Sequence, residues 1–240
     1  MIMENEDRTT HFRFPIRIMQ GVLSGKTDKQ QFLRDALYYH LYAHTIYLEQ
    51  TAEYEENRLT KYKRLAEDMS QVTIANPNLA FDRGAELYEK YFKSKVFVSI
   101  RRATYWEFRN NFDAKTDFDF DCLFAFLALK SIIGRKKYVK TDNALMLARM
   151  SGKETKKEYE VMKPLPFTRY YFDKIKMDLQ LNWNLKYYSR NRGFYCGFDI
   201  TLQELVFVSE SKKKSNREKL LMQEKKEAVK LALERLKIQH

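Results

Sequence analysis

The chain contains little glycine or proline and no long apolar run. Its 240 residues include 7 Gly and 4 Pro, fewer than a loop-rich or disordered protein usually has. No stretch reaches the roughly 18 apolar residues that a transmembrane helix needs. The acidic and polar residues 1–10 lack the basic and apolar parts of a secretory signal. We therefore expect a folded cytoplasmic protein that does not associate with membranes.

The chain also has only two cysteines and few signs of catalytic chemistry. Cys122 and Cys196 lie 74 positions apart in apolar surroundings, which predicts buried thiols in a reducing compartment rather than a disulfide. The sequence contains no Walker loop, nucleophile elbow or paired-cysteine zinc pattern. It therefore favours a protein that is not an enzyme, and it predicts no cofactor, catalytic residue or bound metal.

The chain is rich in aromatic residues and basic charge. The 16 Tyr and 17 Phe provide ample material for a core, and the formal net charge is +12. This charge is concentrated, because residues 130–192 hold 16 Lys or Arg against 6 Asp or Glu. A localised basic surface is typical of polyanion binding, although a solvated basic face would have the same composition.

Apolar residues recur at helical spacing through residues 1–112, which we expect to be entirely helical. Thr27 and Gln30 have the spacing of a capping box at the start of the first long helix. The acidic segment 113–121 then predicts a domain boundary. The expected N-terminal elements are an apolar approach at 11–26 and helices at about 28–49, 54–69, 79–92 and 95–109.

A second region combines helices with short strands. Helical periodicity up to Leu179 gives way to alternation of period two from Trp183 to Ile200, interrupted by a turn at 189–193. These residues predict a helix that leads into a hairpin with a basic tip. The expected elements are a helix at about 120–133, a strand at 138–140, a helix at 142–150, a loop at 153–166, a helix at 168–180 and strands at 183–188 and 194–200.

Residues 117–208 resemble a winged helix-turn-helix domain. The resemblance rests on this order of elements, on the end of the second helix at 147–152 and on the hairpin. The 17-residue link between its second and third helices departs from compact members, which use three or four residues. The expected fold class is mostly α: a helical N-terminal region at 1–112 for partner binding or oligomerisation, a winged helix-turn-helix domain with a short β-hairpin wing at 113–208, and a basic amphipathic C-terminal helix at 209–240.

The resemblance implies that the third helix enters the major groove while the wing contacts the DNA backbone or minor groove. With Phe172, Ile175 and Leu179 facing inward, a helical wheel places Tyr170, Asp173, Lys174 and Met177 outward, and Arg169 lies at the first turn. The outward Asp173 is discordant, because a carboxylate repels phosphate unless it accepts from a base or orients an arginine. The expected DNA-binding residues are Arg169, Tyr170, Lys174, Met177, Arg190, Asn191, Arg192, Arg135, Lys136, Lys137 and Lys140.

These residues predict a protein that binds double-stranded DNA, as a transcriptional regulator or a replication initiator. The first alternative is a winged-helix protein–protein adaptor that does not bind nucleic acid, because a fold alone does not determine function. We expect the N-terminal helices to bind a protein partner or a second copy. The C-terminal helix either packs back on the helical half, which we favour, or pairs with a second copy.

Two other clusters have possible chemistry. Asp117, Asp119 and Asp121 are more consistent with the start of a helix than with a metal site. His40 and His44 have helical i, i+4 spacing, but the sequence offers no third ligand nearby, which favours core histidines. The segment from Arg34 to His40 has the arginine–histidine spacing of HEPN-type ribonucleases, in which both residues act on the scissile phosphate. A ribonuclease is therefore the second alternative.

Overall fold

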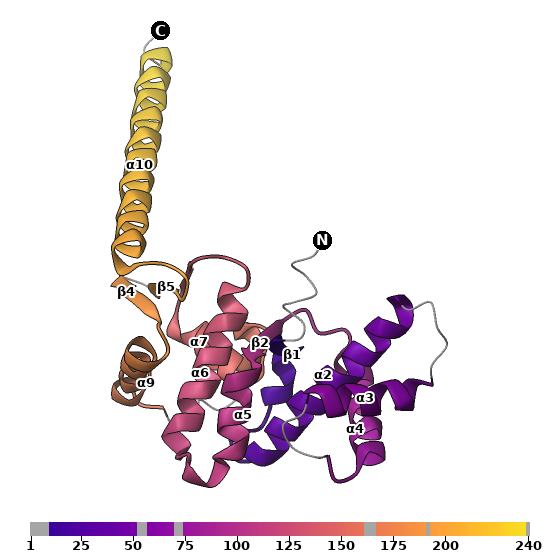
Figure 1. The fold of residues 1–240 in the computed structure, drawn as a ribbon. Coiled ribbons are helices and arrows are strands. Elements are labelled where there is room, and N and C mark those ends of the chain that lie inside the picture. Colours follow the sequence, from indigo (N-terminus) through magenta and orange to yellow (C-terminus); the bar gives the residue numbers. More distant parts are fainter. Residues whose placement is uncertain (1–9, 52–56, 70–73, 161–166, 191–192, 239–240) are drawn as a thin grey trace.

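In the computed structural model, the chain is mostly helical and has two small antiparallel sheets (Figure 1). This confirms the expected fold class at the level of a largely α protein with a few short strands. The structure describes residues 10–51, 57–69, 74–160, 167–190 and 193–238. Among these residues, no helix is long and apolar enough to cross a membrane.

The N-terminal part consists of helices around a two-stranded sheet. Its elements are β1 (His11–Pro15), the 3-10 helix η1 (Ile16–Met19), α2 (Lys29–Thr51), α3 (Arg58–Met69), α4 (Pro77–Tyr91), β2 (Phe97–Arg101), α5 (Arg102–Asn110) and the 3-10 helix η2 (Phe112–Ala114). The helices expected at 28–49, 54–69 and 79–92 are confirmed as α2, α3 and α4.

The expectation that residues 1–112 are all helical was wrong. β1 and β2 form an antiparallel pair in which Phe12 lies opposite Ile100 and Phe14 lies opposite Val98. All four side chains are buried. β2 occupies the start of the helix expected at 95–109, and only α5 remains of that helix. The two strands lie more than 80 positions apart in the sequence, so no local pattern connects them.

The C-terminal part contains the second sheet. Its elements are α6 (Asp117–Ile133), β3 (Val139–Thr141), α7 (Asn143–Met150), α8 (Lys156–Glu160), α9 (Arg169–Asn182), β4 (Lys186–Arg190), β5 (Gly193–Gly197) and α10 (Leu202–Ile238). The sheet order is β3-β5-β4, with antiparallel neighbours. α8 lies within the expected loop at 153–166, of which residues 161–166 lie outside the described residues.

α6 is the central helix of the molecule and is buried on nearly every side. Phe124 contacts Phe32 of α2, with ring centroids 5.2 Å apart, and Phe126 contacts Trp183 at the end of α9, at 4.7 Å. One hydrophobic cluster therefore runs from the N-terminal part through α6 into the C-terminal part. Thr116 and Asp119 form a capping box at the start of α6, as expected of acidic residues at a helix N-terminus.

The three-stranded sheet lies between α9 and α10. Tyr187 of β4 faces Lys176 of α9, whose Nζ lies 5.5 Å from the centroid of its ring. The next residue, Tyr188, points the other way and donates a hydrogen bond of 2.9 Å to Glu210 of α10. Two successive side chains of β4 therefore contact one helix on each face of the sheet.

The C-terminal helix begins earlier than expected. The sequence predicted a C-terminal helix at 209–240, but α10 begins at Leu202. Thr201 caps the helix, because its hydroxyl accepts from the amide of Glu204 while the Glu204 carboxylate accepts from the amide of Thr201. No glycine or proline follows Thr201 in the sequence.

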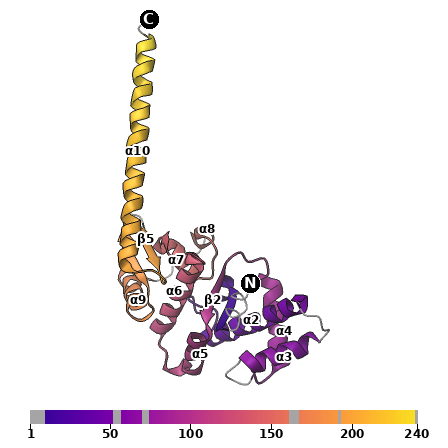
Figure 2. The same ribbon diagram turned by 45° about the horizontal axis from the view of Figure 1, so that its top comes forward.

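α10 does not pack back on the helical half, which corrects our expectation. It leaves the body of the molecule as a long projecting helix (Figures 1 and 2). Its main packing contacts are with β4 and β5, and Leu205 and Ser209 are its buried residues within the described part of the chain. At 1.5 Å per residue, the helix is about 55 Å long.

Burial of α6 predicts the effect of truncating one of its leucines. Leu127 is fully buried, whereas Leu181 on α9 is 77% exposed. Leu127→Ala should lower the free energy of unfolding by about 2–5 kcal/mol, because it removes packed methyl groups and leaves a cavity. Leu181→Ala, which makes the same change in another helix, should cost less than about 0.5 kcal/mol. Urea denaturation measures both, and equal losses would contradict the central role of α6.

Candidate nucleic-acid interface

α9 presents the side chains that a helical wheel places outward. Thr168 caps the helix by accepting a hydrogen bond of 3.2 Å from the amide of Tyr171. Phe172, Ile175 and Leu179 are buried, as the sequence predicted. We call the exposed residues Arg169, Tyr170, Lys174 and Met177 the α9 outer face.

Two neighbouring aromatic and acidic groups orient the cations of this face. Lys174 Nζ lies 4.6 Å from the centroid of the Phe118 ring, at the first turn of α6. Arg169 Nε lies 3.9 Å from the carboxylate of Asp173, and the Arg169 side chain is 94% exposed. An ion pair this exposed contributes little to stability, so Arg169 can leave Asp173 for an external anion. Lys174 is exposed as well and can reach the same anion.

The outward Asp173 has a structural partner. It accepts a hydrogen bond of 3.1 Å from Lys176 Nζ, whose side chain is only 6% exposed. The same ammonium lies 4.8 Å from the ring centroid of Phe172 and 5.3 Å from that of Phe194. Asp173 therefore compensates a buried cation that joins α9 to the hairpin, and its position on α9 does not require a base contact.

A basic turn lies at the opposite end of α6. Arg135, Lys136 and Lys137 are exposed and follow the last residue of that helix. α6 is about 25 Å long at 1.5 Å per residue. Because Lys174 lies over Phe118 at the first turn, this length separates the α9 outer face from the basic turn. The cations of the α9 outer face and those of the basic turn therefore lie apart, at opposite ends of α6.

The hairpin tip contains the other predicted cations. Asn191 and Arg192 lie outside the described residues, as does the side chain of Arg190. The strand register places Arg190 opposite Gly193, and the next residue of β5, Phe194, opposite Thr141. Gly193 and Arg190 thus lie near Thr141, at the end of β3, whereas the basic turn precedes its start at Val139. Lys140 is exposed in the middle of β3, with its Nζ 5.9 Å from the Tyr195 ring centroid.

The early start of α10 adds basic residues that the sequence analysis did not select. Lys212 Nζ lies 4.9 Å from the ring centroid of Tyr138, the residue that follows the basic turn. Lys213 and Lys214 are exposed in the same helical turn. The sequence analysis assigned this lysine run to the basic C-terminal helix and did not include it among the expected DNA-binding residues. As part of a helix packed on the hairpin, it extends the basic turn.

The histidines of the N-terminal part are not placed for surface chemistry. His40 is buried beside Phe12, and its Nδ1 accepts a hydrogen bond of 3.1 Å from the amide of Arg13. Burial, together with the nearby His44, lowers the pKa of His40 to about 3. Arg34, the other residue of the ribonuclease alternative, lines a pocket that does not include His40. The structure thus does not bring these two residues together at one site.

The two cysteines are free and buried, as predicted. Burial raises the pKa of the Cys196 thiol to about 12.

Comparison of the chain with protein-family models, with curated proteins and with solved structures found no match.

Removing the partner of Lys176 should destabilise the protein. Asp173→Asn leaves the buried ammonium without a carboxylate. We expect a loss of about 1–2 kcal/mol in the free energy of unfolding, less than for a fully buried pair because Asp173 is about half exposed. Asp82→Asn, at an exposed position on α4, should have almost no effect. Thermal or urea unfolding at neutral pH measures both, and equal stabilities would remove Asp173 from this role.

The buried His40 should make stability depend on pH. Its folded pKa of about 3 lies below the unfolded value of 6.5, so the unfolded chain binds a proton first as the pH falls. The part of the free energy of unfolding that depends on neutral His40 is fully present above pH 6.5 and is lost as the pH falls below that value. The loss reaches about 2 kcal/mol at about pH 5. His40→Asn can keep an acceptor for the Arg13 amide and should lack this component. Urea titrations of both proteins between about pH 5 and 7.5 test the difference, and parallel curves would contradict it.

Proposed function

We propose that the chain binds double-stranded DNA through a winged helix-turn-helix domain, as a transcriptional regulator or a replication initiator. The observation that carries this proposal is the α9 outer face, on which Arg169 and Lys174 are exposed on a helix whose opposite side is anchored in the core. Lys and Arg on such a helix suit phosphates and guanine edges, and Tyr170 and Met177 add a phosphate donor and an apolar contact.

The order of elements supports the winged-helix assignment. From α6 to β5 it is helix, strand, helices, strand, strand, and the sheet order β3-β5-β4 places the hairpin beside the short strand. The departure from compact members lies between α7 and α9, where the chain inserts α8. α9 packs on α6, while α7 packs on α6 and α8. DNA binding by this chain would therefore depend on α9 and its neighbours more than on a tight helix-turn-helix pair.

The basic turn and the α10 lysines would give the protein a second set of cations that can contact DNA phosphates. Lys212 of the α10 lysines lies over the ring of Tyr138, which follows Arg135–Lys137 in the chain. A duplex carries phosphates along its whole length, so two cation groups about 25 Å apart can contact the same molecule. In this proposal, the α9 outer face reads the groove while the basic turn and the α10 lysines hold the backbone.

A winged-helix protein–protein adaptor is the alternative that one observation favours. Tyr170 is 81% exposed, Met177 59% and Leu181 77%. Large apolar side chains on one exposed helix are also suited to a protein partner. The ribonuclease alternative gains no support from the buried, neutral His40.

Salt-dependent binding of a labelled duplex tests the proposal. Arg169→Gln with Lys174→Gln should weaken binding and lower the slope of log affinity against log salt by up to about 2, because each lost phosphate contact removes about 0.9. Adding Gln at Arg135, Lys136 and Lys137 to this variant should lower the slope of log affinity against log salt further. Fluorescence anisotropy at several salt concentrations measures the slopes.

The control removes charge from the other side of the protein. Lys90→Gln with Lys93→Gln takes two exposed cations from the end of α4 and the residues after it. This variant should keep the wild-type slope. An equal loss in the control, or an unchanged slope in the α9 variant, would contradict a specific interface. Wild-type protein that binds no duplex at low salt would favour the adaptor.

A further inference from the structure

A pocket of about 210 Å³ lies between α2, α5 and η2, outside the surfaces described above. It is smaller than the 300–1,000 Å³ of typical pockets for drug-sized ligands, so it suits a small group. Two of its residues are half-buried arginines. The lining consists of Gln30, Leu33, Arg34, Arg109 and Phe112.

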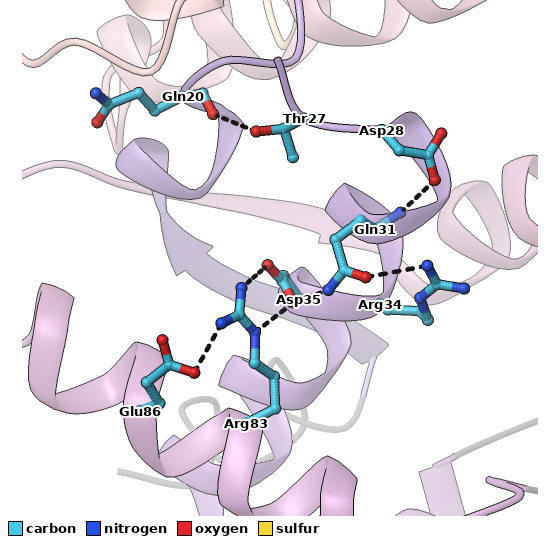
Figure 3. A network of polar contacts seen from close by, with 8 residues as sticks. All are labelled: Gln20, Thr27, Asp28, Gln31, Arg34, Asp35, Arg83 and Glu86. Atoms are coloured by element: carbon cyan, nitrogen blue, oxygen red, sulfur yellow. Dashed lines mark hydrogen bonds and ion pairs between the residues drawn. The ribbon is translucent and has the colours of Figure 1, made fainter. Parts of the chain in front are cut away.

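Arg34 is held by a neutral group. Its Nη2 donates a hydrogen bond of 3.0 Å to Gln31 Oε1, and the amide of the same Gln31 donates to Asp35 (Figure 3). The Asp35 carboxylate is already paired with Arg83, which donates to both of its oxygens at 3.0 and 2.7 Å. Gln31 therefore orients Arg34 without neutralising its charge.

Arg109 is also held by neutral groups. Its Nη1 lies 3.4 Å from the hydroxyl of Tyr105, and that hydroxyl donates a hydrogen bond of 2.7 Å to the carbonyl of Leu33. The guanidinium lies 5.8 Å from the ring centroid of Trp106. Burial raises the pKa of Tyr105, while the positive charges of Arg109 and Arg34 act to lower it. Leu33, whose carbonyl accepts from that hydroxyl, lines the same pocket as both arginines.

Two of the neighbouring carboxylates are engaged elsewhere. Glu107 is paired with Lys115 at 2.6 Å, and Asp117 is paired with Lys29. Within the described part of the chain, Arg34 and Arg109 form no ion pair with any carboxylate. The pocket thus has two oriented and uncompensated positive charges.

We propose that this pocket binds a phosphate monoester. A monoester carries nearly two negative charges at neutral pH, which matches two guanidinium groups. Each guanidinium has five N–H donors, and one of each is used within the protein. The remaining donors suit the several oxygens of a terminal phosphate better than the two of a carboxylate. Gln30 adds an amide donor at the rim, and Phe112 adds an apolar wall for the group that the phosphate carries.

Calorimetric titration with phenyl phosphate tests this site. The wild-type protein should bind one equivalent, and Arg34→Gln or Arg109→Gln should each weaken binding at least about tenfold. Arg101→Gln, which removes an exposed arginine on β2 outside the pocket, should bind as wild type does. Circular dichroism checks that each variant is folded. Arg109→Lys provides a milder second variant, which should bind between wild type and Arg109→Gln because it keeps the charge.

Two further measurements test the monoester assignment. Dimethyl phosphate, a diester with a single charge, should bind at least about tenfold more weakly than phenyl phosphate, because only one guanidinium is neutralised. Affinity for phenyl phosphate should also fall between about pH 7.5 and 5, as the ligand gains a proton near pH 6 while arginine keeps its charge. Unchanged binding after loss of both arginines would overturn the site. Diester binding of equal strength would overturn the monoester assignment and indicate a nucleic-acid backbone contact.

Discussion

The need to cover α6 on all sides determines the rest of the structure. Leu123, Phe124 and Leu127 are fully buried, and a helix that is apolar all round is stable only when other elements surround it. The N-terminal helices and sheet cover one side, through contacts such as Phe32 with Phe124. α7 and α9 cover the other. The two halves of the chain therefore share one core and support each other through α6.

This arrangement separates two kinds of cation. Lys176 is buried between α9 and the hairpin, where Asp173 and aromatic rings compensate its charge. Lys174, only two positions earlier, is exposed at the first turn of α6. Because helical neighbours two positions apart face different directions, one lysine stabilises the fold while the other remains available to an external anion. Overall net charge cannot distinguish these roles.

Much of the helical structure was predictable from the sequence, because a helix is built from local hydrogen bonds and its buried face repeats at a fixed spacing. The faces of α9 followed from the positions of Phe172, Ile175 and Leu179, which are buried as predicted. The hairpin was recognisable from its alternation around Gly193. The start of the C-terminal helix was not found, because the sequence analysis placed it at residue 209 and α10 begins at Leu202.

The sequence by itself determined most of the helical segments, which side chains of α9 point outward and where the basic residues are concentrated. Only the tertiary structure decided that Phe12 pairs with Ile100 across the N-terminal sheet, that Asp173 serves a buried lysine and that Arg34 meets Arg109 in one pocket. It also separated the cations of α9 from those of the basic turn by the length of α6. These outcomes depend on contacts between residues far apart in the chain, and such contacts leave no periodic pattern in the sequence.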